Sequence, residues 1–146
     1  MNYKEVIEYD LSEIVLAPQN EKEFNETIKK VLETINMHGF ETAATKFSIS
    51  DTSRIGGNIG KIKENQLSKE LKKEIQKLKV NDFSKPIFIN NNYLIIKVNQ
   101  KKIINEEFDE NKIVKEIIRI EKDKQYQNFS QIYYNKIKLN SQINEF

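Results

Sequence analysis

The segment whose residue types and spacing first suggest chemistry is the glycine-rich stretch of residues 48–60, which could bind phosphate. Its small polar residues are followed by three glycines, which let a backbone approach another group closely. A phosphate-binding P-loop needs a glycine where Ile55 stands and a Ser or Thr where Ile62 stands, so that class of site is excluded. The small polar residues and glycines predict a loop without regular structure.

Other kinds of catalytic or metal site have little support. The chain has no cysteine, which excludes a disulfide framework, a thiolate zinc site and a cysteine nucleophile. His38 is the single histidine and ends a predicted helix, where we expect it to interact with the helix dipole. No group of histidines and carboxylates has the spacing of metal ligands, and we expect neither a metal nor a cofactor.

The charge pattern argues against nucleic acid as a partner. The 24 basic and 22 acidic residues leave a net charge of +2, too balanced for a protein that neutralises a phosphate backbone. Between residues 69 and 77, lysines alternate with glutamates, which is typical of a solvated helix face. The acidic residues of the 106–110 segment favour a solvated helix start.

No segment predicts a membrane span or a signal peptide. The first ten residues lack an apolar core, and no apolar run approaches the roughly 18 residues that a membrane helix needs. We therefore expect no membrane insertion and no targeting signal in this chain. The alternative, a mature fragment of a longer precursor, stays open.

The hydrophobic pattern predicts an α+β fold, a small antiparallel sheet of about four strands with packed helices. Its 146 residues are enough for one core and one appendage. Caps for the helices are expected at Asn20, Gly39 and Ser68. The predicted order is β-α-α-β-α-β-β, with strands and helices at 5–16, 20–39, 40–47, 60–63, 68–78, 86–89 and 93–98, the last two joined by an Asn-rich turn.

A long helix is predicted from about residue 109 to residue 139, in an appendage that spans residues 104–146 after a domain of residues 1–103. Its apolar residues form two stripes rotated against each other, first Ile113, Val114, Ile117 and Ile120, then Tyr126, Phe129, Tyr133 and Ile137. We expect the first stripe to lie on the domain. The aromatic stripe predicts a partner for it, either an N-terminal domain or a second subunit, and a fold-back onto the same core is the alternative.

Several motifs together resemble the parvulin-type (PpiC, rotamase) peptidyl-prolyl isomerase domain, in order and with matching gaps over about residues 9–101. That family typically carries F-S-x-D, G-G-D-L-G, a Gly-Gln-Met-like turn, L-K-x-G-x-x-S-x-P and G-Y-H-I-I-K-V. The corresponding segments here are Phe47-Ser48, Gly56 to Gly60, Asn65-Gln66-Leu67, Leu78 to Asp82, Ser84 to Ile87 and Tyr93 to Val98. The long helix resembles the C-terminal helix of SurA-type periplasmic chaperones in length and position.

The resemblance implies where catalytic and substrate-binding residues lie. The family's two histidines fall at Glu13 and Leu94, and its Cys or Asp position falls at Ser50, with Asp51 beside it as a substitute. The apolar positions that hold the proline ring fall at Leu67 and Leu71, so Leu67, Leu71 and Leu94, with Gln66, are the expected substrate-binding residues. The apolar surface is therefore kept in kind, whereas the polar centre is changed.

Three functions follow as hypotheses. The first is a catalytically degenerate parvulin domain that binds unfolded, extended or proline-containing polypeptide as a SurA-type chaperone module, in the periplasm if the chain is a mature fragment. The second is an active isomerase that uses Ser50 or Asp51 with Glu13. The third is a scaffold that assembles through the aromatic stripe of the C-terminal helix.

Overall fold

The computed structural model describes the backbone of residues 2–143 and the side chains of residues 2–127. Residues 5–105 form one compact unit, and the remaining described residues form another. The elements along the chain are β1 (Asn2–Leu16), α1 (Glu21–His38), α2 (Phe40–Phe47), the 3-10 helix η1 (Asp51–Ile55), β2 (Asn58–Lys63), the 3-10 helix η2 (Glu64–Gln66), α3 (Lys69–Gln76), β3 (Ile87–Ile89), β4 (Asn92–Phe108) and α4 (Glu110–Ile143).

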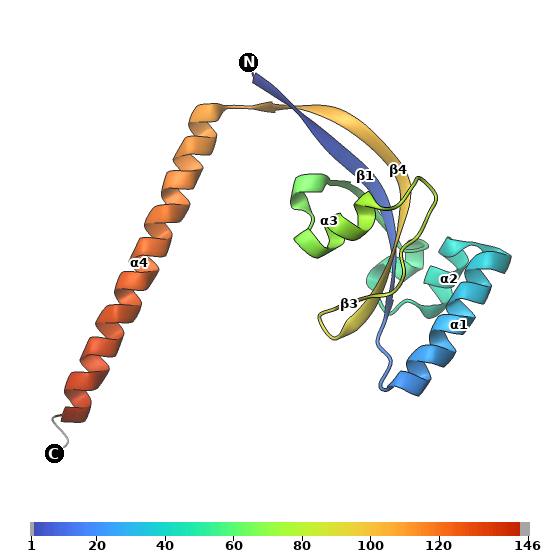
Figure 1. Ribbon diagram of the computed structural model, residues 1–146, viewed down its shortest axis with the longest axis horizontal. Helices are drawn as coiled ribbons and strands as arrows, with labels where there is room; N and C mark the ends of the chain where they lie inside the picture. The colour runs from blue at the N-terminus through green and yellow to red at the C-terminus, as the bar shows by residue number, and fades with distance from the viewer. Residues whose placement is uncertain (1, 144–146) are drawn as a thin grey trace. The chain divides into compact units, whose positions relative to one another are not determined.

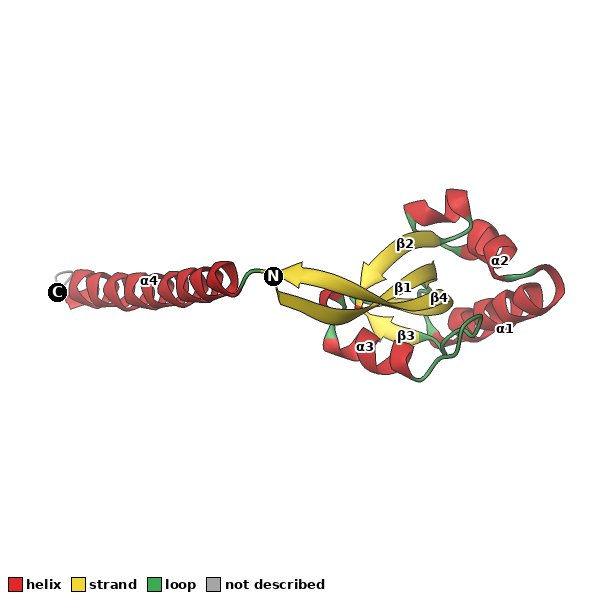
Figure 2. Ribbon diagram, turned by 90° about the horizontal axis from the view of Figure 1, so that it is seen from above, coloured by secondary structure: helices red, strands yellow, loops and turns green. Residues whose placement is uncertain are grey.

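The strands form one sheet in the order β2-β1-β4-β3. Figure 2 shows β1 and β4 side by side in its middle, with β2 and β3 at the edges. The pairs β1–β2 and β3–β4 are antiparallel, and a bulge in the first pair falls after Leu11. The predicted α+β class is therefore confirmed.

Alternation along the two central strands divides the core between the two faces of the sheet. On one face, Ile14, Leu16 and Ile95 pack with buried residues of α1 and α2. On the other face, Tyr9, Leu11, Ile96 and Val98 pack with Ile75 of α3. Figure 1 shows α3 on one side of the strands and α1 with α2 on the other. We call these the α3 face and the α1–α2 face.

The predicted helix caps are confirmed. The Asn20 side chain accepts a hydrogen bond from the Glu23 N–H at 2.8 Å, and the Ser68 side chain accepts one from the Leu71 N–H at 3.3 Å. Gly39 ends α1 with φ at 90°, and its N–H donates to the carbonyl of Ile35. These ends form as predicted because each depends on residues within one turn of the cap.

Three predicted boundaries were wrong. Strand β1 begins at Asn2 and strand β4 continues to Phe108, because each is paired along the sheet beyond its apolar run. The segment 48–60 was predicted to have no regular structure, yet it contains η1 and the start of β2. The Ser50 side chain caps η1 by accepting from the Thr52 N–H, and Gly56 ends it in the left-handed conformation.

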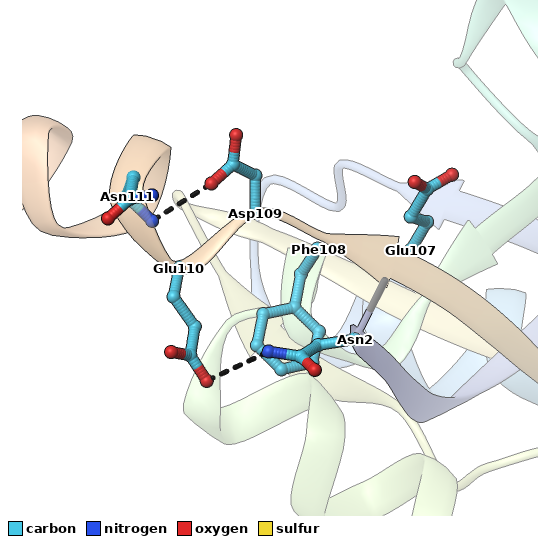
Figure 3. Close-up of a pocket in the computed structure, with 6 residues that line it drawn as sticks. All are labelled: Asn2, Glu107, Phe108, Asp109, Glu110 and Asn111. Carbon is cyan, nitrogen blue, oxygen red and sulfur yellow. Dashed lines mark hydrogen bonds between the residues drawn. The ribbon is translucent and has the colours of Figure 1, made fainter.

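In the second unit, α4 begins at the predicted acidic segment. The Asp109 side chain accepts a hydrogen bond from the Asn111 N–H at 3.0 Å, and Asn2 donates to Glu110 at 3.1 Å. Figure 3 shows both bonds. These side chains and Phe108 line a hollow of about 320 Å³. Asp109 and Glu110 are exposed, as a solvated helix start requires. Glu106 and Glu107, which were predicted to belong to the helix start, lie in β4 instead.

The two stripes of α4 are described only in part. Ile113, Val114, Ile117 and Ile120 are 46, 53, 55 and 45 % exposed, and Tyr126 is 70 % exposed. The side chains of Phe129, Tyr133 and Ile137 lie outside the described residues. What covers either stripe therefore stays a prediction. No helix among the described residues has an apolar stretch of the length and character that crossing a membrane requires.

Candidate functional site

The alternation of β1 places Glu13 on the α3 face. Tyr9 and Leu11 lie on that face, and Glu13 follows Leu11 by two residues with no interruption in its own strand. The Glu13 N–H donates to the carbonyl of Gly57 at 2.8 Å, which holds the segment that follows η1 against β1. Because of this bond, residues far apart in the sequence share one corner of the sheet.

The Glu13 carboxylate joins two hydroxyl groups of the glycine-rich segment. Ser50 Oγ donates to Glu13 Oε1 at 2.7 Å, and Thr52 Oγ1 lies 2.9 Å from the same oxygen and 3.1 Å from Ser50 Oγ. All three side chains are half-buried. The predicted pairing of Glu13 with Ser50 is therefore present as geometry, and its catalytic role stays a prediction.

Thr52, rather than Asp51, completes this polar cluster. Asp51 begins η1 and is exposed, whereas the Thr52 hydroxyl, two residues after Ser50, lies 3.1 Å from Ser50 Oγ. Thr52 was not predicted from the sequence, because only the turn of η1 brings its hydroxyl next to that of Ser50. We call Glu13, Ser50 and Thr52 the polar cluster.

The predicted substrate-binding leucines lie together on the α3 face. Leu67, Leu71 and Leu94 are half-buried and pack against the core cluster that Tyr9 and Ile96 belong to. Ile59 joins the same group, because the bulge in the β1–β2 pair falls at this residue of β2. Ile59 was not predicted from the sequence, because its place depends on that bulge. We call Ile59, Leu67, Leu71 and Leu94 the apolar group.

Gln66 has a structural contact beside this group. Its side-chain oxygen accepts a hydrogen bond from the Lys63 N–H at 3.1 Å, which closes η2. The side chain is exposed next to Leu67. Its expected part in substrate binding stays a prediction.

A buried tyrosine and a carboxylate hold α3 and η2 against the sheet. Tyr9 Oη donates to Glu64 Oε1 at 3.2 Å, and Gln76 donates to the same oxygen at 3.0 Å. Burial, the Glu64 charge and this hydrogen bond raise the pKa of Tyr9 to about 12. The hydrogen bond from Gln76, with the nearby Lys72 charge, lowers the pKa of Glu64 against the effect of its burial. This network fixes the segment that carries Leu67 and Leu71.

Alkaline pH is expected to destabilise the domain through Tyr9. Because the pKa of Tyr9 is about 12 in the folded state and 10.0 ordinarily, the stabilisation is complete below pH 10 and is lost as the pH rises through 12. The total is about 3 kcal/mol. Urea unfolding at pH 9 and pH 12 should show that the free energy of unfolding falls less between these two pH values in Tyr9→Phe than in the parent. The matched control is Tyr3→Phe, at an exposed tyrosine, and an equal loss in Tyr9→Phe and the parent contradicts this prediction.

The site offers an apolar surface and a hydrogen-bonded carboxylate, without an imidazole. His38 lies at the exposed end of α1, and Leu94 has no polar atom in its side chain. Among the residues that the structure describes, no group of three or more His, Cys, Asp or Glu side chains is arranged to hold a metal ion. The chemistry available here is apolar binding next to two hydroxyls and one carboxylate.

Comparison with solved structures finds the same fold. A crystal structure of a PpiC-type peptidyl-prolyl cis-trans isomerase domain is 26 % identical, with a TM-score of 0.57 over 66 % of this chain and 92 % of that one. PrsA from Bacillus anthracis, titled a peptidylprolyl isomerase, is 28 % identical, with a TM-score of 0.54 over 77 % of this chain and 48 % of that one. The parvulin domain of PpiD from E. coli is 22 % identical, with a TM-score of 0.55 over 68 % of this chain and 92 % of that one, a likeness of fold alone.

The match in sequence covers the elements that build the site. No curated protein sequence matches the chain. The family model of the PPIC-type PPIase domain, or rotamase, matches residues 13–100, from Glu13 to the middle of β4. This range includes the polar cluster, the apolar group and both faces of the sheet. Since the model spans more than half of the chain, the protein belongs to the PpiC-type, or parvulin, family of peptidyl-prolyl isomerase domains.

Proposed function

We propose that this parvulin domain binds extended, proline-containing polypeptide through the apolar group and accelerates X–Pro isomerisation weakly or not at all. The observation that carries the proposal is the contrast between two parts of one site. The apolar positions expected to hold the proline ring are kept in kind as half-buried Leu67 and Leu71, whereas Leu94 and Glu13 stand where the family's histidines are expected. Binding of a proline ring needs the first part, and loosening of the amide bond needs the second.

The chemistry of the polar cluster supports this division. The barrier to X–Pro rotation is about 18–20 kcal/mol, so a catalyst has to reduce amide resonance as well as hold the ring. In the polar cluster, the Glu13 carboxylate only accepts hydrogen bonds, and Ser50 directs its proton to that carboxylate at 2.7 Å. The Ser50 proton is therefore engaged within the protein when a substrate arrives.

A chaperone role extends the proposal to the whole chain. A domain that binds proline-containing segments without fast turnover suits a module that holds unfolded polypeptide, as in SurA-type chaperones. PrsA from Bacillus anthracis is similar to this chain, which spans 48 % of that protein's chain. A periplasmic location and a partner for α4 belong to the same proposal.

An active isomerase is the second candidate, and one contact favours it. The 2.7 Å hydrogen bond from Ser50 Oγ to Glu13 polarises the hydroxyl, as a carboxylate does for a nucleophile or a proton donor. In this alternative, the polar cluster replaces the family's histidines and its Cys or Asp. Both candidate functions require binding of proline-containing polypeptide, and they differ in whether the bound X–Pro bond is isomerised quickly.

NMR exchange spectroscopy on an Ala-Pro tetrapeptide separates them. We expect the protein to bind the peptide and to accelerate cis–trans exchange by less than tenfold, because neither histidine is present. Leu94→His should raise the rate only if the remaining geometry supports catalysis, and Ile103→His, at an exposed position of β4, is its control. An acceleration of tenfold or more that disappears in Leu71→Asp contradicts the proposal and supports the active isomerase.

A further inference from the structure

A second hollow lies on the α1–α2 face, between the start of α1 and the β3–β4 hairpin. Its volume is about 580 Å³, and its walls include the rings of Phe24, Phe88 and Tyr93. Tyr93 packs with the core cluster of the α1–α2 face, whereas the next residue, Leu94, packs on the α3 face. The hollow and the apolar group therefore lie on opposite faces of the sheet.

The three rings form a continuous aromatic surface. Phe24 stacks on Tyr93 with ring centroids 4.1 Å apart, and the Phe88 ring is tilted by 56° against Tyr93 with centroids 5.1 Å apart. Phe88 is 62 % exposed although it is large and apolar. Phe88 and Tyr93 are also paired in the β3–β4 register, so the sheet itself holds them side by side.

Both ends of the hollow are held rigidly. Asn90 and Asn91 close the hairpin with φ angles of 51° and 64°, as a tight two-residue turn requires. At the other end, the Gln19 N–H donates to the Glu23 carboxylate at 2.7 Å, and Asn20 caps α1. A site with fixed walls loses little conformational entropy when it binds a ligand.

The polar side chains at the rim are amides with unused hydrogen-bonding groups. Gln19, Asn25 and Asn91 line the hollow, and among the described residues none of these three side-chain amides has a hydrogen-bond partner. An amide NH₂ donates two hydrogen bonds. The one charged side chain in the lining is the Glu21 carboxylate, which disfavours phosphate and other anions.

These features match the chemistry of a polyproline II segment. Such a segment has no internal hydrogen bonds, so its carbonyls need external donors, and its proline rings pack on aromatic side chains. We propose that the hollow formed by Phe24, Tyr93 and Phe88 with the rim amides is a second binding site, for a proline-rich segment in the polyproline II conformation.

The experiment is an NMR titration of the full chain with hexaproline, followed residue by residue. We expect chemical-shift changes at the start of α1 and in the β3–β4 hairpin. Phe88→Ala should weaken this binding at least fivefold and leave the fold intact, because the side chain is exposed. The control is Ile103→Ala, which truncates a side chain that is 66 % exposed elsewhere on β4. This variant should change the affinity for hexaproline less than twofold.

The location of the shifts separates this proposal from the proposed function. Shifts confined to the α3 face overturn the second site and leave the proposed function standing. Shifts confined to the hollow support the second site and contradict binding at the apolar group. Unchanged affinity for hexaproline in Phe88→Ala also overturns the second site, because the ring of Phe88 then takes no part in binding. A parallel titration with the oligosaccharide cellohexaose tests the class of ligand, and binding of cellohexaose without binding of hexaproline overturns the proposal as well.

Discussion

Replacing Leu71 by aspartate is expected to weaken binding of an Ala-Pro tetrapeptide at least tenfold. Leu71 belongs to α3 and, like Leu67, Leu94 and Ile59, packs against the core cluster of the α3 face. A carboxylate in this group removes apolar contact with the proline ring and loses hydration when the peptide covers it. Tenfold corresponds to about 1.4 kcal/mol, less than the value of fully burying one leucine side chain. Isothermal titration calorimetry gives the affinity.

The control for Leu71→Asp is Asn65→Asp. This variant makes the same change of charge at an exposed residue of η2, next to the same apolar group. Circular dichroism melts of both variants show whether α3 remains folded, and Leu71→Ala repeats the test with a smaller disturbance. Equal affinities in the parent, Leu71→Ala and Leu71→Asp, with folded proteins, contradict the assignment of the apolar group as the binding surface.

Replacing Gly57 by alanine is expected to cost about 3 kcal/mol or more of the free energy of unfolding. Gly57 has φ at 81°, and a Cβ there lies 2.3 Å from the Glu13 carbonyl oxygen and 2.9 Å from the Ala44 Cβ. The left-handed conformation costs an alanine roughly 1–2 kcal/mol, and overpacking against the backbone adds about 1–3 kcal/mol. Domains of this size have a total stability of about 5–15 kcal/mol, so the loss is large. Urea unfolding followed by circular dichroism measures it.

Gly60→Ala is a closely matched control. Gly60 also has a positive φ, 90°, but no heavy atom lies within 4 Å of a Cβ built there. Gly60→Ala should therefore lower the free energy of unfolding only by the cost of the left-handed conformation, about 1–2 kcal/mol. The difference between the two variants isolates the close approach of Gly57 to β1. Equal losses in the two variants show that this close approach contributes nothing measurable.

The Gly57→Ala substitution should also disturb the geometry of the polar cluster. The Gly57 carbonyl accepts from the Glu13 N–H at 2.8 Å, and the Gly57 N–H donates to the Thr52 carbonyl at 2.8 Å. Both bonds position residues of the polar cluster. A displaced backbone at Gly57 therefore separates the hydroxyls of Ser50 and Thr52 from the Glu13 carboxylate.

Features of the fold that depend on neighbouring residues were predictable. The Asn20 and Ser68 caps, the Gly39 stop and the Asn-rich turn each involve groups within one turn of the chain. The full length of β1 and β4 was not predictable in this way. Their ends carry charged and polar residues, and their pairing in the sheet extends them.

Residues of the candidate site could be predicted where a family motif matches the sequence at their positions. The resemblance placed Glu13 and Ser50 in one site, and the structure brings them to 2.7 Å. Thr52 and Ile59 were missed, because one depends on the turn of η1 and the other on a bulge in β2. Neither η1 nor the bulge has a strong local signal in a segment rich in Gly and Ser.

The α+β class, the helix ends and the parvulin family could be inferred from the sequence, because these depend on periodicity, caps and ordered motifs. The sharing of sheet faces by side chains, and the groups that they meet there, follow from packing in three dimensions. Tyr93 and Leu94 are neighbours in the chain, yet one faces the aromatic hollow and the other the apolar group. The physical reason is that strand alternation separates neighbours, whereas pairing and helix packing join residues that are far apart in the sequence.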